Sequence, residues 1–474
     1  NLNLGSTKFA VIFHLLSNKE IKNVKKYLAS PFFSNRTVLS SCFGYILSYQ
    51  QQHKTLPDRW TLFQEIFPDA NEYDDQKLRL LLSQLVGAIE DYWVYQLQME
   101  NVQARRIVLA SIYRKKKQEK FFQKSLHTAR KSLEKSPYRS EQFYTEQYRI
   151  ELEAYRHIGA GSRSNTLNLQ VISDALDHGF IIAKLLQACR TLSKQAVSEE
   201  AHDFGLLPYV LQYVEQQNLL QASPAIAAYY YCYQALLGKQ GMQKNFEQFK
   251  AVLFSAEHLF PPEELHDLYL LAINCCIRLI NSGQADFLYE ILGIYKRGLE
   301  NGAVLEHGVL SRFTCQNIVT AGLRTGEYTW TRDFLERYRP QLEKGYRTSA
   351  YRFNLGRIAY SEKNYDEALQ LLRDTDHKDL LVHLFSKTLL LKIYYELAEF
   401  QLLDSFLDAF AIYLRRKKVV GEYQTNYKNV IAYTKKLITI NPFNQAEKDA
   451  LAEQLKQEQI LSERAWLLAQ LAAL

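Results

Sequence analysis

The feature that most limits how this chain can fold is an internal repetition in its second half. The phrase "SGQADFLYEILGIY" aligns with "TGEYTWTRDFLERY", "EKNYDEALQLL" plays the same role further on, and "AEFQLLDSFL" resembles a fourth copy. The steps are 43, 37 and 35 residues when the following positions are taken as equivalent: Ala285, Tyr328, Tyr365 and Phe400. We expect each phrase to open the second helix of a helix–turn–helix unit. A chain with such a period stacks similar units along its length.

The repeat resembles the tetratricopeptide repeat (TPR) family, and the match is best over residues 349–382. Leu355, Gly356, Ala368 and Leu372 stand where that family places Leu, Gly, Ala and a large apolar residue. Small residues at two of these positions let the helices of one unit approach closely. The resemblance extends over about residues 262–416 and implies a TPR-like α-α superhelix.

The chain also departs from the family pattern. Arg352 stands where the family usually has an aromatic residue, Thr375 replaces its small residue and Leu380 its proline. The steps of 43 and 37 residues exceed the ~34 of the family, which implies lengthened helices. The N-terminal segments resemble helical-repeat proteins of Bacteroidota bacteria, and that resemblance implies no particular activity.

The rest of the chain also has a helical pattern, so the predicted fold class is all-α. Only 19 Gly and 10 Pro interrupt 474 residues, and no segment alternates with period two. Residues 74–98 form the clearest helix, since apolar residues from Leu78 to Trp93 recur at i+3 and i+4. The predicted domains are a small helical domain (1–100), a basic helical connector (101–158) and a TPR-like domain (166–474). We expect two long helices in the connector, broken near Pro137, and a linker, "GAGSRSN", at 159–165.

Three asparagines follow the repeat. Asn274, Asn317 and Asn354 are separated by 43 and 37 residues, so they occupy one position on three successive first helices. The family resemblance places that position on the inner, concave face, where an amide can both donate and accept a hydrogen bond with an extended peptide. Arg357 and Tyr360 follow on the same helix and are further candidates. The alternative is that each amide bonds within its own unit or faces solvent.

Residues 101–140 carry a second candidate surface, because twelve Lys or Arg and two Glu give this segment a charge of +10. The whole chain carries +7. On one continuous helix, six of the cations fall in a narrow sector opposite the apolar side, which predicts a basic stripe for phosphates or an acidic partner. The alternative is a solvated helix face. The six residues are Arg106, Lys117, Lys120, Lys124, Lys131 and Lys135.

No motif proposes catalysis, a cofactor or a metal. "GAGSRS" lacks the ending of a phosphate loop and no strand precedes it, and the eleven histidines show no metal-ligand spacing. The six cysteines form no C-x-x-C pair, which indicates reduced, buried thiols and a cytoplasmic location. No apolar run reaches ~18 residues, and no signal peptide is visible, although the first residue is not Met.

The sequence is compatible with three functions. The first is a non-enzymatic scaffold that binds a partner protein or peptide on the concave face of a TPR-like superhelix. The second is a nucleic-acid-associated or regulatory protein that uses the basic 101–140 segment. The third is an enzyme or toxin-like effector whose site has no recognisable motif. The oligomeric state does not follow from the sequence.

Overall fold

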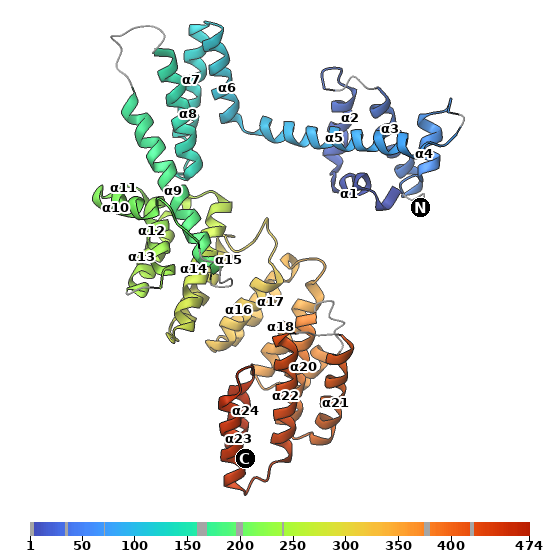
Figure 1. Cartoon of the computed structure of the whole chain (residues 1–474), viewed down its shortest axis with the longest axis vertical. Helices are drawn as coiled ribbons and strands as arrows, with labels where there is room; N and C mark the ends of the chain where they lie inside the picture. The colour runs from blue at the N-terminus through green and yellow to red at the C-terminus, as the bar shows by residue number, and fades with distance from the viewer. Residues whose placement is uncertain are drawn as a thin grey trace. The chain divides into compact units, whose positions relative to one another are not determined.

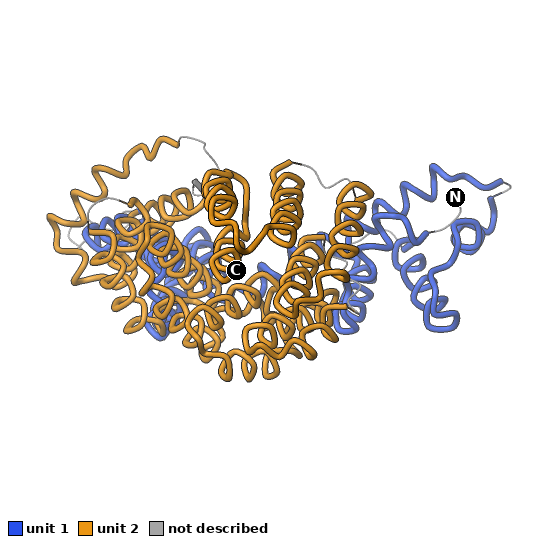
Figure 2. Tube along the Cα trace, turned by 90° about the horizontal axis from the view of Figure 1, so that it is seen from below, with its two compact units in different colours: residues 1–180 blue, residues 181–474 orange. Residues whose placement is uncertain are grey.

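The computed structural model describes residues 4–33, 37–70, 72–158, 168–195, 202–238, 241–373, 380–417 and 421–474. The described residues form 24 α-helices and short 3-10 turns, with isolated bridges in place of strands, which confirms the all-α class (Figure 1). The chain divides into two compact units, residues 1–180 and 181–474, coloured separately in Figure 2. The predicted linker at 159–165 lies outside the described residues.

The first unit begins with five helices around one core. The long helix α5 contacts each of the four helices that precede it. Its predicted apolar face is confirmed, since Leu78, Leu85 and Ile89 are completely buried, and Trp93 donates a hydrogen bond to Glu20. The helices are α1 (Lys8–Leu15), α2 (Asn18–Ala29), α3 (Thr37–His53), α4 (Arg59–Ile66) and α5 (Asp75–Glu100), after the 3-10 turn η1 (Leu4–Ser6).

Residues 102–158 form three mutually contacting helices with a separate core. The prediction of two helices broken near Pro137 is wrong, because the chain also turns at Lys117. This residue adopts a left-handed conformation (φ 55°), and the N–H groups of Lys117 and Gln118 bond to the carbonyls of Arg114 and Tyr113. This is a Schellman helix ending, with lysine where glycine is usual. The helices are α6 (Val102–Lys115), α7 (Glu119–Glu134) and α8 (Glu141–Ile158).

The second unit contains the repeat, and successive helices pack as pairs. α14 contacts α15, α16 contacts α17, α18 contacts α19, and α20 contacts α21, while the first helices α16, α18 and α20 also contact one another in turn. The paired helices are α14 (Pro262–Asn281) with α15 (Phe287–Glu300), α16 (Arg312–Arg324) with α17 (Tyr328–Tyr338), α18 (Arg347–Ser361) with α19 (Tyr365–Arg373), and α20 (Leu380–Glu396) with α21 (Phe400–Arg416).

Other helices precede and follow these four pairs. Helix α9 runs across the boundary between the two units, and the helices from α10 to α13 follow it. The remaining elements are α9 (Leu169–Gln195), α10 (Leu207–Gln216), α11 (Leu219–Ala222), α12 (Pro224–Leu236), α13 (Met242–Ala256), η2 (Glu257–Leu259), η3 (Arg339–Gln341), α22 (Glu422–Thr439), α23 (Gln445–Gln457) and α24 (Arg464–Ala473).

The turns inside the four pairs share one backbone geometry. The second residue after each first helix is left-handed, and its own N–H and that of the following residue bond back to carbonyls of the helix in the Schellman pattern. These residues are separated by 43, 37 and 35 residues, the same steps as the repeated phrases, so the predicted helix–turn–helix units are present. They are Gly283, Gly326, Lys363 and Ala398.

Candidate functional site

The three repeated asparagines do not form one exposed row. Asn274 donates a hydrogen bond to Ser193 Oγ of α9 at 2.7 Å. Asn317 is exposed, and its amide lies near the hydroxyl of the buried Tyr295. Asn354 is 1% exposed, and its Nδ2 donates to the carbonyl of Ala350 at 2.9 Å. Asn317 is therefore exposed, Asn274 half-buried and Asn354 buried.

Arg357 lies beside Asn354 and connects α18 to α16. Its guanidinium donates to Asn354 Oδ1 at 3.1 Å, to Thr320 Oγ1 at 2.7 Å and to the carbonyl of Gln316 at 3.3 Å. Burial lowers the pKa of Arg357 to about 10, so the group is still cationic at neutral pH. In the described part of the chain, no carboxylate forms an ion pair with it. A positive charge therefore lies between these two first helices with only neutral acceptors.

Tyr360 belongs to a different cluster, centred on the carboxylate of Glu396. The hydroxyls of Tyr360 and Tyr365 donate to this carboxylate at 2.5 and 2.7 Å, and Trp466 Nε1 donates to it at 2.8 Å. Burial, with Glu396 beside it, raises the pKa of the Tyr360 hydroxyl. The cluster connects α18, α19, α20 and α24, so Tyr360 holds helices together at this point.

A pocket of about 210 Å³ opens across the first helices α16, α18 and α20. Asn317 and Asn354 both line it, whereas Asn274 does not. Phe313 and Phe385 remain 56% and 36% exposed at this surface. The complete lining is Arg312, Phe313, Gln316, Asn317, Ala350, Phe353, Asn354, Leu381, Val382 and Phe385.

The aromatic residues of this pocket are not among the residues predicted from the sequence, although the repeat contains a signal for them. Phe313, Ala350 and Phe385 are separated by 37 and 35 residues, so they occupy one position on three successive first helices. Phe313 also precedes Asn317 by four residues, which puts both on one helix face. The positions four residues before each repeated asparagine position, one helical turn away, would have identified the two phenylalanines.

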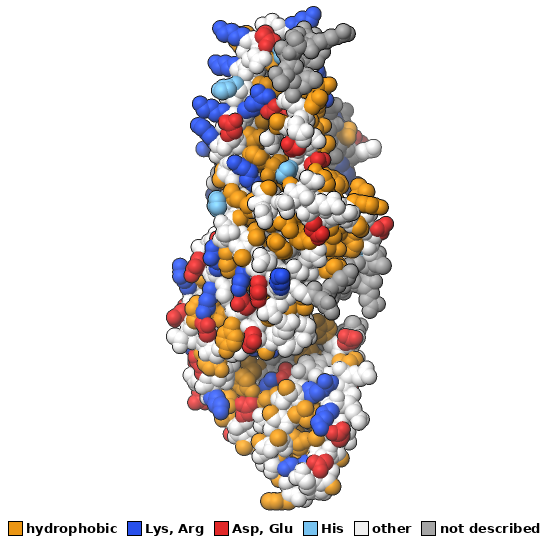
Figure 3. Space-filling view, turned by 90° about the vertical axis from the view of Figure 1, so that its left-hand side faces the viewer, with side chains coloured by type: hydrophobic (Ala, Val, Ile, Leu, Met, Phe, Trp, Pro, Cys, Tyr) orange, Lys and Arg blue, Asp and Glu red, His pale blue; other side chains and the backbone are white. Residues whose placement is uncertain are grey.

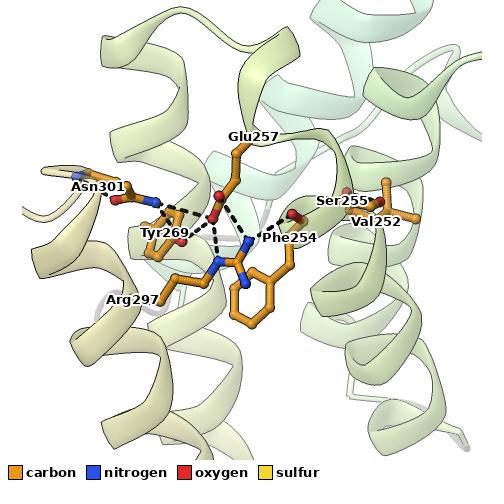
Figure 4. A network of polar contacts seen from close by, with 8 residues as sticks. Val252, Phe254, Ser255, Glu257, Tyr269, Arg297 and Asn301 are labelled. Atoms are coloured by element: carbon orange, nitrogen blue, oxygen red, sulfur yellow. Dashed lines mark hydrogen bonds and ion pairs between the residues drawn. The ribbon is translucent and has the colours of Figure 1, made fainter.

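A second polar cluster, at the junction of α13, α14 and α15, is internally satisfied (Figure 4). Arg297 donates to both carboxylate oxygens of Glu257, at 2.8 and 3.1 Å, and stacks 4.3 Å from the ring centre of Phe254. The hydroxyl of Tyr269 donates to the same carboxylate and accepts from Asn301 at 2.9 Å. Because the charges neutralise each other, this network ties the three helices together and offers no free group to a ligand.

The basic residues of 101–140 lie on two helices and the turn between them. The continuous helix assumed for the basic stripe is wrong, since α6 ends at Lys115 and α7 begins at Glu119. Arg106 is half-buried on α6, whereas the five lysines on α7 and its flanking turns are exposed and form no ion pair with any described residue. The exposed five are Lys117, Lys120, Lys124, Lys131 and Lys135.

The apolar side predicted for α7 is correct, since Phe122, Leu126, Ala129 and Leu133 are all buried. The lysines therefore take the solvent side of this helix. Cationic side chains are visible along one edge of the upper part of Figure 3, the level at which Figure 1 draws α6 to α8. The cationic face suits a polyanion or an acidic partner.

Other kinds of site have no counterpart among the described residues. No group of three or more His, Cys, Asp or Glu within them is placed to hold a metal ion. All six cysteines are buried thiols, as the sequence predicts. Of the helices described, none combines the length and apolar character needed to cross a membrane.

The fold and the pocket define an all-helical protein whose second unit contains helix–turn–helix repeats with a small apolar pocket across three first helices. Comparison with protein-family models, with curated proteins and with solved structures finds no match.

Proposed function

We propose that the second unit is a non-enzymatic, TPR-like interaction scaffold that binds an apolar segment of a partner protein at the α16–α18–α20 pocket. The observation that carries this proposal is the pair of exposed aromatics, Phe313 and Phe385, beside Asn317. At about 210 Å³ the pocket is smaller than the ~300–1,000 Å³ typical of small-molecule sites, which favours insertion of one or two side chains.

The polar residues around the pocket would orient the bound segment. The exposed amide of Asn317 offers N–H groups and an oxygen with which to bond a peptide backbone. The nearby Arg357 cation has no carboxylate partner among the described residues, so a segment with an acidic residue would be favoured. Asn354 lies in the pocket wall but is 1% exposed, and Tyr360 belongs to the Glu396 cluster, so neither is expected to bond the bound segment.

Phe313→Asp is expected to weaken binding of such a segment roughly 10- to 100-fold, because burying a phenylalanine side chain contributes about 1.5–3 kcal/mol. The probes are peptides selected on the full chain from a random phage-displayed library, and affinity is measured by fluorescence anisotropy. Asn317→Ala should cost at most about tenfold, the value of one hydrogen bond.

The matched control is Tyr289→Asp, which changes an aromatic residue on α15 that is 63% exposed and outside the pocket. Selected peptides that lack large apolar residues, or that bind Phe313→Asp and Tyr289→Asp equally well, would contradict the proposal.

A second candidate function is favoured by the exposed lysines on α7 and its flanking turns, which could contact nucleic acid. The triple change of Lys117, Lys120 and Lys124 to Glu is expected to weaken binding to labelled DNA or RNA while the chain stays folded. For duplex DNA, each lost phosphate contact lowers the slope of log affinity against log salt by about 0.9.

The control for this experiment is charge reversal of Lys22, Lys25 and Lys26, three exposed lysines on α2 of the same unit. Equal affinities and equal salt slopes for the two triple variants would mean that the α7 lysines are a solvated face.

A further inference from the structure

Helix α6 has apolar residues on two opposite sides. Ile107 and Ala110 enter the core shared with α7 and α8. On the other side, Val108, Leu109 and Ile112 are 59%, 41% and 42% exposed. A helix that buries one face normally presents polar residues on the opposite side, so the exposed apolar residues on the outer side of α6 depart from that pattern.

This outer side continues onto the end of α5 and forms a groove, defined here as the α5–α6 groove. Leu97 and Met99 of α5, 72% and 37% exposed, lie along it together with Val102, which is 49% exposed. The groove has a volume of about 870 Å³. Scattered single apolar residues need no explanation, but a contiguous apolar hollow of this kind marks an interaction surface.

The charge at the groove is of one sign. Its lining includes Arg105 and Arg106 and no carboxylate, within the described residues 72–158. Lys115, Lys116 and Lys117 follow directly at the end of α6, are exposed, and have no ion-pair partner among the described residues. Any ligand that covers the apolar side chains therefore meets a positive rim.

We propose that the α5–α6 groove binds an acidic amphipathic helix of a partner protein. Leucine-like side chains at i, i+3, i+4 and i+7 of such a helix would cover Leu109 and Ile112, while its carboxylates would meet the arginines and lysines of the rim. This surface lies in the first unit and is independent of the pocket proposed above.

Other occupants fit the groove less well. A second copy of this chain would place its own residues 101–140, with a charge of +10, against the same residues of the first copy. Like charges at an interface are unfavourable. Nucleic acid satisfies the cations but offers no aliphatic side chains for Val108, Leu109 and Ile112. A lipid surface engages protruding apolar residues, whereas these line a hollow.

The test uses the full chain and a synthetic helical peptide of about 18 residues, about five turns, with leucines on one face and glutamates elsewhere. Binding is measured by fluorescence anisotropy at low salt. We expect Leu109→Asp to weaken binding at least about tenfold, and neutralising Lys115 to Lys117 to weaken it several-fold with a smaller dependence on salt.

The control variant is Leu80→Asp, which changes an exposed leucine of α5 outside the groove and should leave the affinity unaltered. Circular dichroism checks that both variants fold, and Phe313→Asp should bind this peptide like the unmodified chain.

Four results would overturn the proposal. They are failure of the glutamate peptide to bind, equal binding of a peptide with lysine in place of glutamate, equal affinities of the Leu109→Asp and Leu80→Asp variants, and a Leu109-dependent preference for another occupant. The last outcome is tested for each occupant in turn. Sedimentation of the chain alone tests for a dimer, phosphatidylserine vesicles test for a lipid surface, and labelled DNA tests for a nucleic acid.

Discussion

Replacing Gly322 by alanine is expected to destabilise the second unit by about 1–3 kcal/mol, the usual cost of overpacking a core. A Cβ at this position of α16 would lie 2.0 Å from Oγ1 of Thr331 and 3.2 Å from its Cβ. Thr331 is fully buried on α17, and its Oγ1 already donates to the carbonyl of Glu327 at 2.7 Å. The threonine therefore cannot turn away without losing that bond. Thermal or urea unfolding of the full chain, followed by circular dichroism, measures the loss.

Two further variants make this prediction specific. Gly322→Ala combined with Thr331→Ala should recover part of the lost stability, because the colliding atoms are gone, and the double-mutant cycle should show coupling. Gly293→Ala is the matched control, since a Cβ at this helical position of α15 has nothing within 4 Å. That control should be neutral or stabilising. Gly322→Ala at least as stable as the unmodified chain would mean that α16 and α17 are not in close contact.

Glu151→Ala is expected to cost about 3 kcal/mol, near the lower end of the range for breaking a buried ion pair. Arg130 donates to both carboxylate oxygens of Glu151 at 2.7 Å, and Asn168 donates to one of them at 2.6 Å. The Glu151 side chain is 12% exposed, so in the Glu151→Ala variant Arg130 and Asn168 would lose a buried hydrogen-bond acceptor. The Arg130 side chain is 41% exposed, and water can partly restore its solvation. The cost is measured by urea unfolding of the full chain, with hydrogen exchange of the backbone amides in α6–α8 as the readout.

The same residue makes the stability of these helices depend on pH. Burial alone would raise the pKa of Glu151, but the hydrogen bonds from Arg130 and Asn168 outweigh it and hold the pKa below its ordinary value. A depressed carboxyl pKa contributes stability that is present above the unfolded value of about 4.3 and is lost as pH falls through the folded value. In Glu151→Gln, the loss of stability on acidification should be smaller.

Glu134→Ala is the control for both measurements, because Glu134 is an exposed carboxylate at the end of α7 that acts on Arg130 through its charge without a hydrogen bond. Replacing Arg130 and Glu151 together by apolar residues should cost less than Glu151→Ala alone, since no charge is then left without its partner. Equal stabilities of Glu151→Ala and Glu134→Ala would show that the pair contributes nothing.

The sequence led to part of the candidate site and not to its main contacts. It named Asn317 and Asn354, which line the pocket, through their spacing of 37 residues. It assigned all three asparagines one environment, whereas Asn317 is exposed and Asn354 is 1% exposed. Equivalent positions in a drifting repeat have different neighbours, because the residues packed against them are not repeated.

By itself the sequence determined that this chain is helical and where its repeated units begin. Both depend on local sequence. Apolar residues three and four positions apart define a helix face, and each repeated turn is formed by a few consecutive residues that recur in the sequence at steps of 43, 37 and 35. Only the tertiary structure decided that α6 ends in a left-handed lysine, that Arg357 and Tyr360 bond inside the fold, and that Phe313 and Phe385 remain exposed. Whether a helical side chain is buried or accessible depends on the neighbouring helix that packs against it, and those partners are tens of residues away in the chain.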